Sequence, residues 1–279
     1  MTDEFPNEDR EVPALALRNL TVTFGAQDGR GASYTAMSDT TLLVQRGEFL
    51  SVVGPTGCGK STLLNVAAGL LAPSRGTVEV FGEPLRGLDR RAGYLFQTDA
   101  LMPWFSALQN VAIGLRYRGM QKDEANVRAD EWLRRVGLGG HGHRFPHELS
   151  GGMKKRVALA QTLILDPQII LMDEPFSALD VQTRALMENE LLVLWSAHRK
   201  SVIFITHDLE EAISLSDRVI VLSAGPHTHP IGSFAIDLPR PRDVAEVRLE
   251  PRFLELHREI WRTMKDEVLK GYAQQQVAG

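Results

Sequence analysis

The segment GPTGCGKST, from Gly54 to Thr62, has the residue types and spacing of a phosphate-binding loop. It fits the pattern G-x-x-x-x-G-K-S/T and lies between an apolar run and a predicted helix, as that pattern requires. Gly57 and Gly59 let backbone N–H groups turn inward, so that they can bind phosphate oxygens. Lys60 can reach the β and γ phosphates, and the Ser61 hydroxyl can bind Mg²⁺. We predict nucleotide contacts from the whole segment: Gly54, Pro55, Thr56, Gly57, Cys58, Gly59, Lys60, Ser61 and Thr62.

Two adjacent acids follow a second apolar run, IILMDEP. If that run is a strand of a parallel sheet, Asp173 lies at the carboxyl edge where ligands bind in such folds. We expect Asp173 to hold Mg²⁺ and Glu174 to polarise the water that attacks the γ phosphate. The run SVIFITHD ends in the same way, and His207 is expected to hydrogen-bond the γ phosphate or that water. The alternative is a solvated strand end and a structural histidine.

The segment HELSGGMKKR raises the question of a second phosphate site. Ser150, Gly151 and Gly152 precede a run that reads as a helix, and the free N–H groups of a helix start bind anions. The loop at 54–62 already supplies such a site, and one helix start so far along the chain cannot easily serve the same phosphates. The sequence pattern alone does not say which phosphates this second site would bind.

The elements around these residues predict an α/β fold. Apolar strand patterns before residue 97 and after 165 alternate with helical ones, as expected of a parallel sheet with crossover helices. Helical patterns fill 97–164, including DEANVRADEWLRRVGL with Val127, Trp132 and Val136 at helical spacing. We therefore predict a flexible tail at 1–12, a catalytic domain at 13–240 and a C-terminal helical extension at 241–279. The core and β lobe would take 13–96 and 165–240, with the helical lobe inserted at 97–164.

Composition narrows the possible functions of the 279 residues. A formal charge of -4 gives no reason to expect a polyanion-binding surface, so we predict no nucleic-acid partner. Cys58 is the lone cysteine, and the acidic N-terminus does not resemble a signal peptide, which together predict a cytoplasmic protein. No apolar run approaches the roughly 18 residues that span a bilayer. If the function is transport, another chain must supply the channel.

Cys58 and the C-terminal residues each have two interpretations. The cysteine is either a small residue within the loop or a thiol whose pKa is lowered by the helix start, which thiol reagents would then modify. The apolar positions Phe253, Leu256, Ile260, Met264 and Val268 recur every three or four residues and predict an amphipathic helix. Because its polar face mixes acidic and basic residues, we expect the helix to dock on the domain and not on a membrane surface.

Taken together, these motifs resemble those of the ATP-binding subunits of ABC transporters, from Leu15 to about Leu222. The resemblance rests on GPTGCGKST, LFQTD, LSGGM, LMDEPFSALD and ITHD, which occur in the order of that family. It implies a P-loop NTPase (RecA-like) core with an antiparallel β lobe and an inserted α-helical lobe, with ATP and Mg²⁺ as cofactors. It also implies a head-to-tail homodimer, in which the LSGGM segment of one chain caps the γ phosphate bound by the other. Ser150, Gly151 and Gly152 would then complete the partner's site.

The same resemblance implies further site residues. Gln97 would contact Mg²⁺ or the attacking water, and residues 177–180 would form a loop crossing between the two sites. Adenine would stack on Phe24 in VTFG, with Tyr34 as a competitor. Three features depart from the pattern: Met153 stands where glutamine is common, Thr162 where arginine is common, and the loop 25–33 is longer than usual.

The segment TDALMPWFSALQ resembles the importers of nitrate, sulfonates, taurine and thiamine precursors. That subgroup implies integral membrane permease subunits as partners, an indirect solute-binding protein outside the membrane, and a peripheral position on the cytoplasmic face of the inner membrane. Trp104 and its apolar neighbours would anchor a permease helix, or else belong to the core of the helical lobe. The alternatives are an exporter ATPase, a DNA-repair ATPase, which would need a long coiled-coil insertion, and a P-loop kinase, which has no use for LSGGM.

Overall fold

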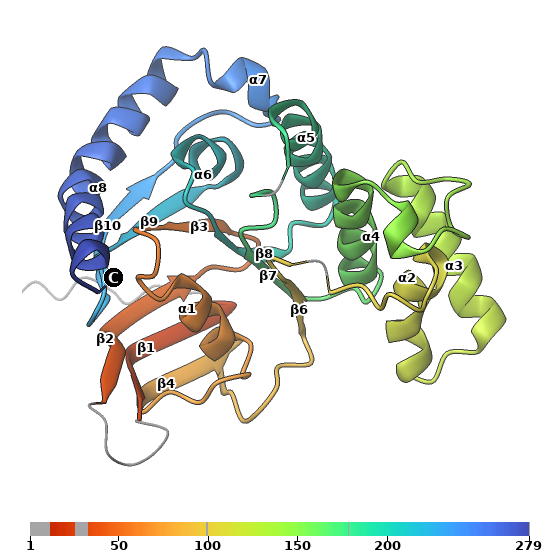
Figure 1. Ribbon diagram of the computed structural model, residues 1–279, viewed down its shortest axis with the longest axis horizontal. Coiled ribbons are helices and arrows are strands. Elements are labelled where there is room, and N and C mark those ends of the chain that lie inside the picture. The colour runs from red at the N-terminus through yellow and green to blue at the C-terminus, as the bar shows by residue number, and fades with distance from the viewer. Residues whose placement is uncertain (1–11, 26–32, 99, 178, 279) are drawn as a thin grey trace, which may run out of the picture.

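A mostly parallel sheet forms the centre of the fold (Figure 1). The structure, a computed structural model, describes residues 12–25, 33–98, 100–177 and 179–278. Within those ranges, the strands pair in the order β10-β9-β3-β8-β7-β6, and each neighbouring pair is parallel except β9 with β10. Their bounds are β3 (Phe49–Val53), β6 (Ala92–Leu95), β7 (Ile169–Asp173), β8 (Ser201–Ile205), β9 (Arg218–Leu222) and β10 (Pro230–Ala235). The last of these was not anticipated from the sequence.

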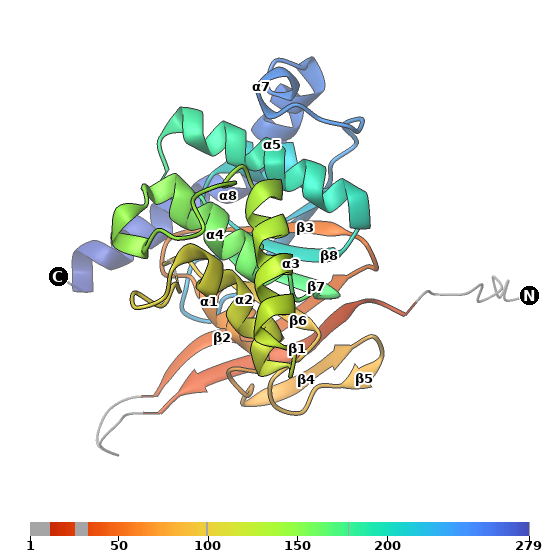
Figure 2. The ribbon, with the colours of Figure 1, turned by 90° about the vertical axis from the view of Figure 1, so that its right-hand side faces the viewer.

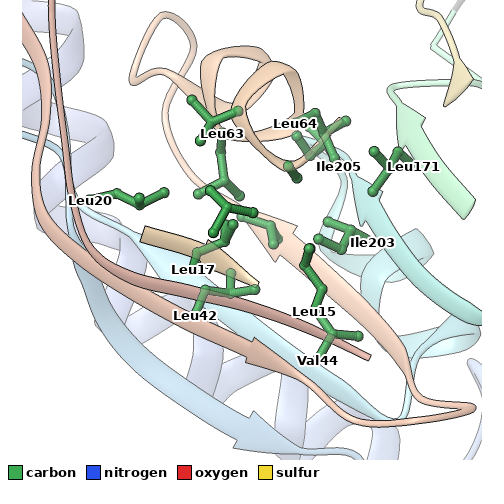
Figure 3. Packing of buried hydrophobic residues seen from close by; sticks show 14 of the residues in the cluster. Leu15, Leu17, Leu20, Leu42, Val44, Leu63, Leu64, Leu171, Ile203 and Ile205 are labelled. Atoms are coloured by element: carbon green, nitrogen blue, oxygen red, sulfur yellow. The ribbon is translucent and has the colours of Figure 1, made fainter. Parts of the chain in front are cut away.

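The central strands are mostly apolar because helices cover both faces of the sheet. β3, β7 and β8 are buried at every position. Helix α1 (Lys60–Ala67) packs on one face, where Leu63 and Leu64 meet Ile203 and Ile205 (Figure 3). Helices α5 (Val181–His198) and α6 (Leu209–Leu215) cover the other face.

A second, antiparallel sheet lies below α1 in Figure 1. Its buried side chains pack with those of α1 and of the central strands in one cluster. It contains β1 (Leu15–Phe24), β2 (Tyr34–Val44), β4 (Arg75–Val80) and β5 (Glu83–Pro84), paired in the order β2-β1-β4-β5. Leu15 and Leu17 of β1 point toward α1 in Figure 3 and belong to the same buried cluster as the central strands. The described part of the predicted tail is Val12 alone, and the predicted loop 25–33 is described only at its two ends.

Helices beyond the β6 edge of the sheet form a separate lobe (Figures 1 and 2). They are α2 (Ala107–Tyr117), α3 (Lys122–Arg135), the 3-10 turn η1 (Pro146–Glu148) and α4 (Gly151–Leu163). The predicted helix α3 is present, but Val127, one of the apolar residues that indicated it, does not face the core and is 59% exposed. Ala125, Ala129 and Leu133 face the lobe instead, because small side chains let α3 approach α2 and α4 closely.

The C-terminal residues form α7 (Val244–Val247) and the long α8 (Pro251–Ala278). Helix α8 lies along the outer side of β9, β10 and α6, so both ends of the sheet are flanked by helices (Figure 1). Phe253, Leu256, Ile260 and Met264 are buried against that layer, and Val268 is partly buried beside them. The amphipathic pattern therefore corresponds to docking on the domain.

Candidate active site

The phosphate-binding loop connects β3 to α1. Gly57 and Gly59 have φ values of 79° and 105°, in the left-handed region where a side chain would be strained. Gly59 is the N-cap residue of α1, so the loop lies at the positive end of that helix. A cavity of about 340 Å³ opens at this point, and it is lined by Thr56, Gly57, Gly59, Lys60, Ser61, Thr62, Gln97, Glu174 and His207.

Lys60 is held by its own loop. Its Nζ donates to the carbonyls of Gly54 at 2.9 Å and Pro55 at 3.0 Å, and the side chain is buried. These carbonyls hold the ammonium group at the cavity, where a phosphate oxygen can compete for its protons. The lysine is therefore in position before any anion arrives.

Asp173 ends β7 beside Ser61 and is buried, as expected of a strand that delivers a carboxylate to the sheet edge. Burial raises the pKa of Asp173, whereas a hydrogen bond from the Ser61 hydroxyl lowers it. The repulsion of Glu174 raises this pKa further, and the attraction of Lys60 lowers it. A desolvated carboxylate beside a hydroxyl is a suitable donor set for Mg²⁺, which prefers oxygen ligands.

Glu174 contacts two other side chains that line the cavity, His207 and Gln97. Its φ is 42°, an uncommon value for a residue with a side chain, and its N–H donates to the carbonyl of Ile205 at 2.9 Å. The Oε2 atom of Glu174 is 3.0 Å from His207 Nδ1 and 3.3 Å from Gln97 Nε2. The ends of β6, β7 and β8 thus bring an acid, an imidazole and an amide together.

Gln97 is also tied to the helical lobe. Lys155 of α4 donates from Nζ to the Gln97 carbonyl at 2.6 Å. The start of α4 itself lies elsewhere, because Ser150, Gly151 and Gly152 do not line the cavity. Ser150 caps the helix by accepting the Met153 N–H at 3.3 Å. Ser150, Gly151 and Gly152, the second segment predicted to bind phosphate, therefore lie outside the cavity formed by the first segment of the same chain.

The two candidate adenine-stacking residues, Phe24 and Tyr34, are paired across β1 and β2. Both rings are exposed, and neither lines the cavity. Tyr34 reaches the loop more directly: its hydroxyl lies beside Gly225, where backbone atoms of Gly57 and Cys58 also lie. Which ring stacks on adenine stays a prediction.

The lowered pKa proposed for Cys58 is wrong. The residue is 2% exposed and packs in the cluster beneath α1. Burial raises the pKa of this thiol and outweighs the attraction of Lys60, which lowers it. Cys58 is therefore the small, buried residue of the alternative interpretation.

The apolar segment before α2 is held in a fixed turn by buried Asn110. The Asn110 Nδ2 group donates to the carbonyls of Phe105 at 2.9 Å and Met102 at 3.2 Å, while Oδ1 accepts the Met102 N–H at 2.8 Å. Trp104, at the tip, is 69% exposed and packs edge-on against Phe105. The interpretation of Trp104 as core of the helical lobe is therefore wrong.

Sequence reasoning missed two features next to the site. Arg184 joins the segment after Glu174 to the residue after His207, a pairing that no short motif reveals. A second cavity, of about 420 Å³, lies between the phosphate loop and α8 and is lined by Gly54, Pro55, Thr56, His207, Trp261, Met264, Val268 and Gly271. The amphipathic period of α8 predicts which of its residues are buried, but it does not predict that α8 and the phosphate loop line one cavity.

The described residues contain neither a helix long and apolar enough to cross a membrane nor a cluster of three or more metal-binding His, Cys, Asp or Glu side chains. The second finding fits a cation held partly by a hydroxyl, an amide or a nucleotide, since those groups are not counted in such a cluster.

Comparison with known proteins gives consistent matches. Residues 37–177 match the protein family described as ABC transporter. An uncharacterised ABC transporter ATP-binding protein of Methanocaldococcus jannaschii is 45% identical, over 96% of this chain and 97% of that protein. The taurine import ATP-binding protein TauB of Jannaschia sp. is 40% identical over 91% and 96%, and the bicarbonate transport ATP-binding protein CmpD of Synechocystis sp. is 38% identical over 90% and 89%.

Among solved structures, a dimeric ATP-binding cassette in a post-hydrolysis state with ADP and Pi has a TM-score of 0.72 and 32% identity, covering 81% of this chain and 100% of that one. This likeness confirms the predicted P-loop NTPase fold. The relatives confirm the resemblance to the importer subgroup that includes taurine transport. With its family matched over half its length and by relatives aligned almost end to end, the chain belongs to the ABC transporter ATP-binding proteins and is an ATPase of that family.

Proposed function

We propose that the chain hydrolyses Mg²⁺-ATP at the interface of a head-to-tail homodimer and thereby drives uptake of a small anion or sulfonate-type solute through a separate permease. The observation that carries the hydrolytic part is the contact of Glu174 with both His207 and Gln97 at the mouth of the phosphate-loop cavity. A carboxylate held by an imidazole and an amide is positioned to orient and polarise a water molecule.

The charged and polar side chains at the cavity or beside it would then have separate roles. Lys60 would exchange its loop carbonyls for β- and γ-phosphate oxygens. Ser61, Asp173 and Gln97 would hold Mg²⁺, which neutralises phosphate charge when it is bound. Glu174 would accept the proton of the attacking water, and His207 would hydrogen-bond the γ phosphate.

The dimer explains the second phosphate-binding segment. Because Ser150, Gly151 and Gly152 do not line their own chain's cavity, they are free to cap a γ phosphate held by another copy. The solved relative described as a dimer with ADP and Pi supports this arrangement. A head-to-tail pair of identical chains gives a closed twofold assembly with two equivalent sites.

The transport part rests on the exposed apolar segment and on the relatives. The rigid turn held by Asn110 presents Trp104 to solvent, and an exposed tryptophan on a fixed turn is suited to anchor a permease helix. Taurine and bicarbonate, which name two relatives, are both small and carry an anionic group. We infer a peripheral position at the cytoplasmic face of the inner membrane, with a solute-binding protein acting indirectly from outside. An exporter ATPase is the alternative.

The hydrolytic proposal is tested with Glu174→Gln. This variant keeps the shape and hydrogen bonds of the side chain but cannot accept a proton, so turnover should fall by about 10²–10⁴-fold. ATP binding should persist, and size-exclusion chromatography with Mg²⁺-ATP should show a stable dimer. Glu210→Gln, which changes an exposed acid on α6, serves as the matched control and should hydrolyse ATP normally. Brisk turnover by the Glu174 variant would assign the base elsewhere.

The coupling role is tested with Trp104→Ala in the complex with the permease. Solute uptake should be lost, whereas basal ATP hydrolysis by the isolated chain should be unchanged. Tyr117→Ala removes another exposed aromatic ring of the same lobe and should leave uptake intact. Normal uptake by the Trp104 variant would contradict the anchoring role, and movement of solute outward only would favour the exporter.

A further inference from the structure

A group of charged side chains lies behind the catalytic edge of the sheet, where α5 and α6 begin. Arg184, in the first turn of α5, donates from Nη1 to Asp208 Oδ2 and from Nη2 to the Leu179 carbonyl, each at 3.2 Å. The same Nη1 lies 3.5 Å from Glu211 Oε1. One guanidinium group therefore joins the segment that follows Glu174 to the segment that contains His207.

The side of the cluster near His207 is tightly connected. Thr206 donates its hydroxyl proton to Glu211 Oε2 at 2.5 Å and accepts the Asp208 N–H at 3.0 Å. Asp208 in turn caps α6 through the N–H groups of Glu210 and Glu211. The residues on both sides of His207 are thus fixed to α6 and to Arg184, although the imidazole itself is exposed.

The side near Glu174 is a compact turn. The Ser177 hydroxyl donates to the Glu174 carbonyl at 3.0 Å, and the Leu179 N–H donates to the Phe176 carbonyl at 3.0 Å. Leu179 and Phe176 are buried, which fixes this turn against the core. These two hydrogen bonds link the Leu179 end of the segment to the backbone of Glu174.

These contacts close a ring: Glu174 to Leu179 along the chain, Leu179 to Arg184, Arg184 to Asp208, and His207 back to Glu174 at 3.0 Å. We infer that Arg184 is a positioning residue for ATP hydrolysis, because it completes the ring that sets the distance between Glu174 and His207. The inference rests on the proposed roles of those two residues. Arg184 does not line the cavity, so it acts only through them.

Arginine suits this position better than lysine. Its planar group donates in diverging directions at once, to a carboxylate on one side and a backbone carbonyl on the other. Lysine has one nitrogen on a flexible stem and would keep the attraction to the two acids while weakening the bond to Leu179. The ring also adjoins the helical lobe, since a methyl group added at Gly152 would lie 2.7 Å from Thr183 Cγ2, next to Arg184.

The experiment compares Arg184→Met with Arg248→Met. Arg248 belongs to the same charged cluster, bonds Glu188 at 3.2 Å and Glu210 at 3.4 Å, and is as exposed as Arg184, at 24%. Neither of these two ion pairs includes a residue of the ring, so Arg248 controls for the loss of a half-buried charge. Both variants should lower the unfolding temperature by comparable amounts. Only Arg184→Met should lower kcat, by about 10–100-fold, because small errors in position have effects of that size.

The split between kcat and KM separates positioning from nucleotide binding. In Arg184→Met, the KM for ATP and the affinity for a non-hydrolysable ATP analogue should stay within about twofold of the wild type. Arg184→Lys should recover part of kcat, and it keeps the test decisive if the methionine variant does not fold. Equal kcat in the two methionine variants, or a loss confined to KM, would overturn the inference. Failure of the proposed function would appear separately, as normal turnover by Glu174→Gln.

Discussion

Glu188 of α5 should make the stability of this protein depend on pH near neutrality. The side chain is 0% exposed, and its Oε2 atom faces Arg248 at 3.2 Å. Burial, followed by the repulsion of Glu211, raises the pKa of Glu188 from 4.5 to about 7, while Arg248 lowers it. Asp208 repels the carboxylate and Arg184 attracts it more weakly. The protonated form is therefore the one that the fold accommodates.

The sign and size of the effect follow from linkage. Between pH 4.5 and about 7, Glu188 is protonated in the native state and ionised in the unfolded chain, so stability falls as pH rises. A tenfold change in proton affinity corresponds to about 1.4 kcal/mol, so the raised pKa of Glu188 makes the protein about 3 kcal/mol more stable below pH 4.5 than above neutrality. For a chain of this size, that amounts to a fall of about 6 °C in the unfolding temperature.

The assay is thermal unfolding from pH 5 to pH 8 for the wild type and Glu188→Gln. Glutamine keeps the shape of the side chain and cannot ionise, so the decline in unfolding temperature with pH should be smaller in the variant than in the wild type. The decline that remains belongs to other buried acids with raised pKa values, such as Glu211. Glu210→Gln removes the exposed acid that faces the same Arg248 and should retain the decline. An unchanged pH dependence in Glu188→Gln would refute the assignment of this titration to Glu188.

Three further predictions concern residues that do not line the cavity at the phosphate loop. Because Cys58 is buried and its pKa is raised, a thiol reagent should label the native chain at least tenfold more slowly than the chain in denaturant, and complete labelling on mixing would contradict this. Ile260→Ala, in the buried face of α8, should cost about 2–5 kcal/mol of unfolding free energy in urea titrations, with a smaller loss for half-exposed Trp261→Ala. Arg242→Met removes the donor for backbone carbonyls of α6 and of the β10–α7 connection and should cost about 1–3 kcal/mol in the same assay, because these carbonyls lose their hydrogen bonds, so an unchanged unfolding free energy would exclude this role.

The sequence predicts the part of the site that depends on local pattern and on the direction of the strands. The loop at 54–62 needs only its glycines, a preceding strand and a following helix, and all three are present. Asp173 and His207 could be placed at one edge because parallel strands end there together. The neighbouring strands β7 and β8 bring Glu174 and His207 to the same edge of the sheet. The exact distance between the two side chains cannot be predicted from the strand order alone.

The predictions that failed depend on packing between distant segments. For Cys58 the sequence allowed a reactive thiol or simply a small residue, and the second interpretation holds because Cys58 packs with residues of β1 and β2 and burial raises its pKa. The helical period of α3 was right, yet alanines and not Val127 face the lobe, because the distance between helices selects for small residues. The exposure of Trp104 could not be read from an apolar run either, since core and docking segments have the same composition.

The ring through Arg184 shows why long-range ion pairs are the hardest part of a site to predict. Helix α5 and strand β8 lie between its two ends in the sequence. Residues in the ring or next to it also have a local interpretation: Asp208 caps a helix, and Thr206 follows the end of a strand. Their joint effect exists only because β7 and β8 are neighbours, which places the starts of α5 and α6 side by side. The residues proposed to contact ATP can be predicted from short motifs, whereas the residues that hold those groups in place depend on the order of the strands in the sheet.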